Sequence, residues 1–137
     1  MDFTVDKFLG DRVLLKQSKV GLRATSDAVL LAALVPAQKG DCILDVGAGN
    51  GVIDCCINAR IPCTFTAIEI QESLCKLIAE NAQKNNCPMD LIQHDILTSK
   101  DPLKGQLFDH VVTNPPFYEI GQNMRKNPEQ KKIHSLL

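Results

Sequence analysis

The sequence predicts an α/β protein built on a parallel sheet. Short apolar runs typical of buried strands alternate with segments of helical periodicity, and this alternation implies right-handed crossovers between parallel strands. The four core strands are expected at residues 42–46, 63–68, 89–93 and 107–113. With 137 residues the chain holds one domain and not two, and a domain of this size buries roughly two-thirds of its unfolded surface.

An N-terminal extension is expected over residues 1–36, ahead of a core at 41–118. The Gly10-Asp11 pair is a turn signal and predicts a small hairpin within residues 8–19. A helix is then expected from the hydroxyl cap at Thr25 or Ser26 up to Pro36.

The core helices are expected at residues 52–60 and 71–85, and the second shows apolar side chains at steps of three and four. The segment 98–106 is polar, contains Pro102 and Gly105, and is expected to be a loop with at most a short helix. Residues 119–137 form a basic tail with little apolar pattern.

Composition excludes several classes of protein. Lys and Arg number 15 and Asp and Glu 16, so the formal net charge is -1 and a strongly basic nucleic-acid coat is excluded. No apolar run approaches the roughly 18 residues of a membrane span. The acidic start lacks the cationic region of a signal peptide, so the expected location is the cytoplasm, without a membrane partner.

The six cysteines are expected to be reduced, buried small hydrophobes. They are Cys42, Cys55, Cys56, Cys63, Cys75 and Cys87. No spacing is C-x-x-C, and no histidine stands at zinc-finger distance from a cysteine, so no metal site is expected.

A glycine-rich turn follows the first core strand. Gly47, Gly49 and Gly51 come directly after a strand that carries Asp45, and glycine lets the backbone turn sharply and approach a ligand. The dinucleotide fingerprint needs glycine where Val52 stands. The strand aspartate suits a cationic ligand and would repel a pyrophosphate. A tight turn that binds nothing gives the same pattern.

Acids also stand at the ends of the second and third strands. Glu69 lies 24 residues after Asp45, where a carboxylate can accept hydrogen bonds from both ribose hydroxyls. Asp95, beyond the third strand, can accept from an adenine amino group. A solvated helix-start acid and a loop acid are the competing interpretations.

The fourth strand ends in Asn114-Pro115-Pro116-Phe117. Two prolines fix the backbone and remove two N–H donors. The Asn114 side-chain oxygen and the Pro115 carbonyl can then accept the two hydrogens of an exocyclic amine, while Phe117 stacks on its ring. A proline-stiffened turn is the competing interpretation. The motif therefore indicates a site that holds a planar amine, at the same edge of the sheet as the glycine loop and Glu69.

These motifs resemble S-adenosylmethionine-dependent methyltransferases with the N-P-P-[FY] motif. The stretch from Gly21 to Ala32, which contains Arg-Ala-Thr-Ser-Asp, is similar to the opening of the bacterial tRNA1(Val) (adenine-N6)-methyltransferase family. The resemblance covers residues 8–118 and implies a tRNA substrate, methylated on an adenine next to the anticodon.

The resemblance also implies roles for individual residues. The methionine end of the cofactor would lie near Arg23, Thr25 and Asp27. The cofactor loop would contain Asp45, Gly47, Gly49 and Gly51, with Glu69 on the ribose and Asp95 on the adenine. The target base would be held by Asn114, Pro115, Pro116 and Phe117, and Asn114 would also border the cofactor. Two departures are Ser26, inside the N-terminal motif, and Asp54-Cys55-Cys56 on the first core helix, where apolar residues would be expected. Of these, Asp54 is interpreted as an exposed helix acid.

The implied fold is the Rossmann-like class I methyltransferase fold, with helices on both faces of a sheet ordered 3-2-1-4-5-7-6. The chain would supply the first four strands, in order 3-2-1-4, as a single partial domain over residues 1–137 that lacks the C-terminal strands. The fourth strand would then be an exposed edge, open to pairing with a second copy of the chain.

Other functions remain open at this stage. The motif also fits methylation of an rRNA guanine or a protein glutamine. A truncated remnant that binds the cofactor without catalysis is a further alternative. Val52 argues against a dehydrogenase, and the net charge, single tyrosine and absence of tryptophan argue against a plain RNA-binding module.

Overall fold

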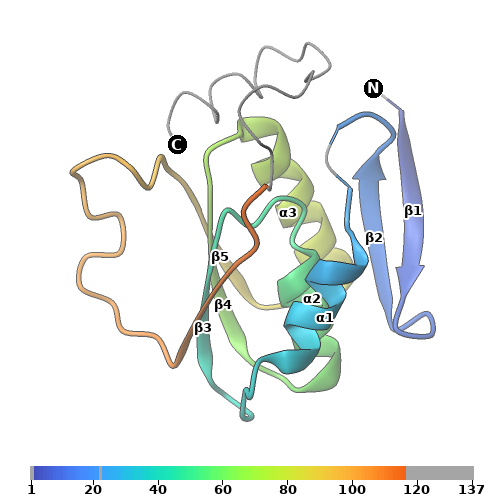
Figure 1. Ribbon diagram of the computed structural model, residues 1–137, viewed down its shortest axis with the longest axis horizontal. Helices are drawn as coiled ribbons and strands as arrows, with labels where there is room; N and C mark the ends of the chain where they lie inside the picture. Colours follow the sequence, from blue (N-terminus) through green and yellow to red (C-terminus); the bar gives the residue numbers. More distant parts are fainter. Residues whose placement is uncertain (1, 22, 117–137) are drawn as a thin grey trace.

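The computed structural model describes residues 2–21 and 23–116, which form two sheets and three helices (Figure 1). In chain order the elements are β1 (Phe3–Phe8), β2 (Val13–Ser18), α1 (Ser26–Leu34), β3 (Cys42–Val46), α2 (Val52–Arg60), β4 (Thr64–Glu69), α3 (Glu72–Lys84), β5 (Met89–Gln93) and β6 (His110–Thr113).

The larger sheet has the order β5-β4-β3-β6, and every neighbouring pair in it is parallel. Counted from β3, this is the 3-2-1-4 order that the sequence predicts. Because parallel strands end at a common edge, the segments that follow β3, β4, β5 and β6 meet on one side of the sheet. The candidate residues at those strand ends therefore gather at one edge.

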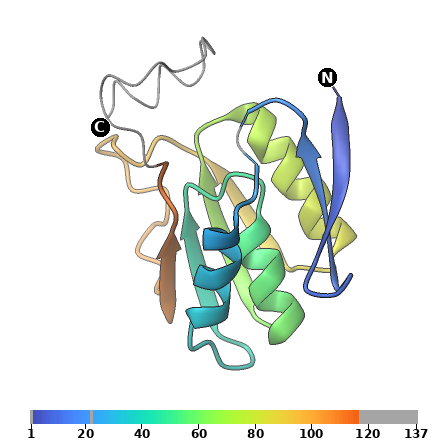
Figure 2. The ribbon, with the colours of Figure 1, turned by 45° about the vertical axis from the view of Figure 1, so that its right-hand side comes forward.

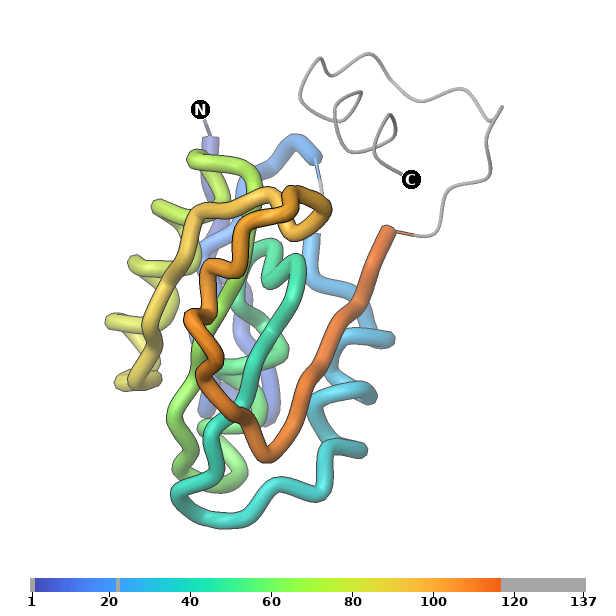
Figure 3. Tube along the Cα trace, turned by 90° about the vertical axis from the view of Figure 1, so that its left-hand side faces the viewer, coloured from blue at the N-terminus to red at the C-terminus, as the bar shows by residue number. Residues whose placement is uncertain are grey.

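The three helices cover one face of this sheet, between it and the hairpin (Figures 1 and 2). Segment 94–109 crosses the opposite face (Figure 3). It contains no helix, because Pro102 and Gly105 interrupt it. The expected helical cover on both faces is thus realised on one face only, within residues 2–21 and 23–116.

The hairpin begins earlier than predicted, at Phe3 instead of residue 8, with β1 antiparallel to β2. The first strand escapes the apolar pattern because β1 is an outer strand whose side chains are exposed or half-buried. By contrast, β2 alternates buried and half-buried side chains. Its buried face, which includes Val13 and Leu15, joins the core under the helices.

Strand β6 is shorter than the predicted 107–113. Leu107 lies outside it and is 88% exposed. Just before β6, Asp109 bonds the first residue of β3: its N–H donates to the Cys42 carbonyl, and its carboxylate accepts from the Cys42 N–H, both at 2.8 Å. The Asp109 carboxylate thus accepts an N–H that a backbone carbonyl would accept if β6 paired with β3 over more residues.

All six cysteines are free thiols. Five are buried, as predicted, and Cys42 is half-buried. The described residues contain no group of three or more His, Cys, Asp or Glu side chains that could hold a metal ion. Their helices include none long and apolar enough to cross a membrane.

Candidate functional site

The glycine loop joins β3 to α2 at the carboxyl edge of the sheet. Gly47, Gly49 and Gly51 all have left-handed backbones, with φ of 75°, 62° and 78°. The N–H groups of Gly47 and Ala48 both donate to the Ile68 carbonyl of β4, at 2.8 and 3.1 Å. The loop is therefore fixed to two neighbouring strands before α2 begins.

The two sides of this loop differ in the room they leave. A Cβ placed on Gly47 or Gly49 would meet no atom within 4 Å, whereas one on Gly51 would lie 3.6 Å from Cγ2 of Ile78. Gly51 is thus packed against α3, and the first two glycines border open space. The open side is where a ligand can approach the backbone.

Glu69 ends β4 beside the loop and is only 5% exposed. Its Oε2 accepts the Gly49 N–H at 2.9 Å, and its Oε1 accepts the N–H groups of Ile70 and Gln71 at 2.9 and 3.0 Å. Because each carboxylate oxygen has two lone-pair sites, Oε2 keeps acceptor capacity for a hydroxyl group. The structure thus brings Glu69 and Gly49 together, as an arrangement around a ribose requires.

Asp45 lies under the loop, fully buried, and faces Asp54 of α2. Burial raises the pKa of Asp45 to about 7, and burial together with Asp45 raises the pKa of Asp54. None of the four carboxyl oxygens has a hydrogen-bond partner among the described residues. The interpretation of Asp54 as an exposed helix acid is therefore wrong, because every residue of α2 from Val52 to Ile57 is buried.

The ends of β5 and β6 complete this edge. Asp95 is half-buried, and its Oδ1 accepts the Leu97 N–H at 2.9 Å in a tight turn. Thr113 Oγ1 donates to the Val46 carbonyl at 2.8 Å, which holds the end of β6 beside the end of β3. Asn114, half-buried, comes directly after that bond. Phe117 lies outside the described residues, so its role stays a prediction.

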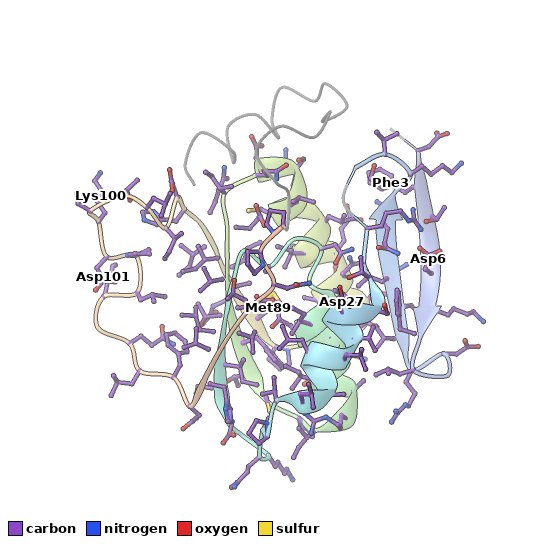
Figure 4. The ribbon with its side chains drawn as sticks, viewed as in Figure 1. Phe3, Asp6, Asp27, Met89, Lys100 and Asp101 are labelled. Atoms are coloured by element: carbon purple, nitrogen blue, oxygen red, sulfur yellow. The ribbon has the colours of Figure 1, made fainter. Side chains whose placement is uncertain are left out.

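The N-terminal candidates lie on the segment that joins the hairpin to α1 and at the start of α1. The Arg23 guanidinium pairs with the Asp6 carboxylate and donates to the Ser18 carbonyl at 3.0 Å, which ties it to the hairpin. Thr25 is the cap of α1 and Asp27 lies in its first turn, both exposed (Figure 4 labels Asp6 and Asp27). Their proposed position at the methionine end of a cofactor stays a prediction.

Comparison with known protein families identifies the family of this chain. The model of the methyltransferase small domain matches residues 22–133. The chain belongs to this methyltransferase family. The family is one of S-adenosylmethionine-dependent methyltransferases.

Similar proteins agree with this assignment. A protein of Shewanella amazonensis named tRNA1(Val) (adenine(37)-N6)-methyltransferase is 32% identical over 84% of this chain and 50% of its own length. A precorrin-6y C5,15-methyltransferase from Geobacter metallireducens superposes with a TM-score of 0.61 at 16% identity, over 72% of this chain and 53% of that one.

A methyltransferase from Thiobacillus denitrificans, solved with S-adenosyl-L-homocysteine, gives a TM-score of 0.55 at 17% identity, over 65% of this chain and 36% of that one. Both solved structures show the shared fold. The chain spans about half the length of the curated relatives it matches.

The glycine loop and the residues beside it fit a nucleoside cofactor in three respects. Gly47 and Gly49 face open space, so that the backbone can approach a ligand. Glu69 is fixed by backbone N–H groups and retains acceptor capacity. Asp45 places a titratable carboxyl, without a basic partner among the described residues, beneath the same loop.

Sequence reasoning missed three buried side-chain amides in and beside the glycine loop. They are Gln17, Asn50 and Asn81. Gln17 carried a usable signal, because it continues the inward-facing row of Val13 and Leu15 on β2 as the only polar member. Nothing local indicates that its partner lies 33 residues away in the glycine loop.

Proposed function

We propose that this chain carries an S-adenosylmethionine-dependent N-methyltransferase site acting on an exocyclic amine, with adenine N6 of a tRNA next to the anticodon as the preferred target. The observation that carries the proposal is the position of Asn114 and Pro115 at the end of β6, next to the end of β3 that leads into the glycine loop and across β3 from Glu69 of β4. The names of the relatives support the choice of tRNA.

In this proposal the cofactor is held by Gly47, Gly49 and Glu69, and Asp95 contributes at the adenine end. When bound, the cofactor supplies an electrophilic methyl group on a sulfonium. The Arg23, Thr25 and Asp27 group borders the methionine end.

Asn114 and Pro115 hold the acceptor. The Asn114 side-chain oxygen and the Pro115 carbonyl accept the two amine hydrogens, which draws the nitrogen lone pair out of the ring and aims it toward the methyl group. Pro115 and Pro116 supply no competing N–H donors, and Phe117 stacks on the base. Positioning supplies most of the rate, and the nitrogen releases its proton after methylation, so no general base is needed.

The test is methyl transfer from labelled S-adenosylmethionine to unmodified tRNA, to rRNA or to a release factor. We expect N6-methyladenine in the tRNA digest, at least 100-fold less product with Asn114→Ala, and unchanged product with Asn58→Ala. Asn58 is a matched control because it bonds the Asn86 carbonyl and the Cys63 N–H, near the opposite ends of the strands. Product on guanine or on protein alone would overturn the adenine assignment.

A second candidate is cofactor binding without catalysis. It is favoured by the edge at β6, which pairs with no further strand among the described residues and where Val111 is 64% exposed. Calorimetric titration with S-adenosylmethionine, run beside the transfer assay, separates the two. Binding with no product supports the second candidate, and turnover by the isolated chain refutes it.

A further inference from the structure

Three buried side-chain amides form a cluster, here called the amide cluster, next to the glycine loop. Gln17 comes from β2, Asn50 from the loop itself and Asn81 from α3. Their residues are 2%, 7% and 0% exposed. At this burial each polar atom needs a protein partner, since an unmatched one is costly.

Asn50 is held from three directions. Its Nδ2 donates to Gln17 Oε1 at 3.0 Å, its Oδ1 accepts the Val52 N–H at 3.3 Å, and its backbone carbonyl accepts Asn81 Nδ2 at 2.9 Å. The hairpin, the start of α2 and α3 therefore all fix the same residue. Its neighbour Gly49 is the residue whose N–H meets Glu69.

The orientation of the Gln17 amide is itself determined. Its Oε1 also accepts the Ala24 N–H at 2.6 Å, and its Nε2 donates to the Asp6 carboxylate. The same carboxylate pairs with Arg23. With the nitrogen committed to a carboxylate and the oxygen to two N–H donors, the amide cannot turn over without losing every bond.

We infer that Gln17 is a positioning residue of the cofactor site. Through Asn50 it holds residues Gly49–Gly51 of the glycine loop in the backbone conformation in which the Gly49 N–H donates to Glu69. This inference rests on the proposed function. It makes the N-terminal hairpin a working part of the site, although no hairpin residue needs to touch the cofactor. It also assigns Arg23 and Asp6 a task, which is to fix the Gln17 amide.

The main test compares Gln17→Met with Lys16→Met in the full chain. Both put the same unbranched side chain on adjacent positions of β2. Lys16 faces the other way, where it pairs with Glu80 at 2.6 Å. The two readouts are the dissociation constant for S-adenosylmethionine and the hydrogen exchange of the Gly49 and Val52 amides, both well below the melting temperature.

For Gln17→Met we expect roughly tenfold weaker binding, the loss of about one well-placed hydrogen bond. Exchange at Gly49 and Val52 should accelerate at least tenfold. Lys16→Met should change neither readout. Wild-type affinity and exchange rates in Gln17→Met would overturn the inference, and so would equal effects of the two variants.

Asn50→Asp provides a second route if Gln17→Met does not fold. It keeps the Oδ1 acceptor for Val52 and replaces the Nδ2 donor by an oxygen that faces Gln17 Oε1. We expect the same acceleration of exchange at Gly49, and its absence would also overturn the inference. Failure of the wild-type chain to bind S-adenosylmethionine would refute the proposed function instead, while the exchange comparison would still report on Gln17.

Discussion

Two groups of buried polar side chains lie beside the same glycine loop, and they differ in whether their polar atoms have hydrogen-bond partners. The amide cluster satisfies its polar atoms with partners from the hairpin, the loop and α3. The pair of Asp45 and Asp54 leaves all four of its oxygens without a partner among the described residues. Both are almost fully buried, so solvent does not account for the difference.

The amide cluster holds the loop in a fixed geometry, whereas the stability of the Asp45 and Asp54 pair depends on its charge. Neutral amides with complementary partners can be buried at small net cost, and they hold no proton that titrates. Two carboxyls without a cation among the described residues are buried at a cost that depends on whether they hold protons. Near neutrality the carboxyl pair is thus expected to titrate, whereas the three amides are not. The following predictions test that contrast.

The largest effect is expected from breaking the amide cluster at Asn81. Asn81→Leu keeps the volume but leaves the Lys16 N–H, the Lys16 carbonyl and the Asn50 carbonyl unpaired in a fully buried place. We expect a loss of about 4 kcal/mol in the free energy of unfolding, measured by urea denaturation.

Asn85→Leu is the matched control for Asn81→Leu. Asn85 lies one turn along α3 and bonds the N–H and carbonyl of Leu14 at 2.9 and 2.8 Å, but it is only half-buried. Water can replace its bonds, so the loss should be about 2 kcal/mol. Equal losses from the two variants would show that burial does not set the energetics of these amides.

The carboxyl pair should respond to substitution in the opposite direction. Burial raises the pKa of Asp45 to about 7 from its ordinary 3.8, and that of Asp54 is raised too. Between about pH 4 and pH 7 the folded protein therefore holds protons that the unfolded chain releases, and the free energy of unfolding falls as pH rises. Asp54→Asn removes one of these groups and supplies an amide donor on the side chain that faces Asp45.

We expect Asp54→Asn to match the wild type near pH 4 and to be the more stable of the two at pH 7.5, because only the wild type then carries a buried carboxyl at position 54 whose raised pKa opposes folding. Urea denaturation at several pH values measures the difference. A gain that is the same at pH 4 and pH 7.5 would mean that packing, and not proton binding, separates the variants.

Much of the edge follows from sequence because its signals are local. Apolar runs and glycines locate the strands and the turn after β3, whereas the strand order follows from the family resemblance. The burial of Asp54 could not be inferred in that way, because a first-turn helix acid is ordinarily exposed. Here α1 and β2 both pack against α2, which leaves the first turn no solvent-facing side. That enclosure depends on contacts far apart in sequence, as does the bond from Gln17 to Asn50.

A smaller effect is expected in the loop between the two groups. Gly49→Ala puts a methyl group on a residue with φ of 62°, and Gly40→Ala does the same at φ of 87° in the turn before β3. Neither Cβ would meet an atom within 4 Å, so both should lose about 1 kcal/mol of stability from left-handed strain.

Only Gly49→Ala should also weaken binding of S-adenosylmethionine, by tenfold or more, because its methyl group enters the open side of the loop. Calorimetric titration of the two variants compares them at matched stability. If Gly40→Ala weakened binding equally, the effect would be one of general stability, and the open side of the loop would lose its assignment.

The smallest expected effect is a change in ligand preference with pH. S-adenosylmethionine and S-adenosylhomocysteine differ by one methyl group and one positive charge, so the ratio of their affinities isolates how the site responds to charge. As Asp45 ionises near pH 7, the pair beneath the loop gains negative charge, and Glu69 adds to that field. The preference for the sulfonium should therefore rise by roughly threefold between pH 6 and pH 8, a weak Coulombic effect across partly screened space. In the double variant Asp45→Asn/Asp54→Asn the ratio should stay flat, because neither amide titrates. The amide-cluster variant Gln17→Met should lower both affinities and leave the slope intact. A flat ratio in the wild type would mean that the charge of the pair does not affect the bound ligand. Asp45 and Asp54 would then influence only the pH dependence of folding stability.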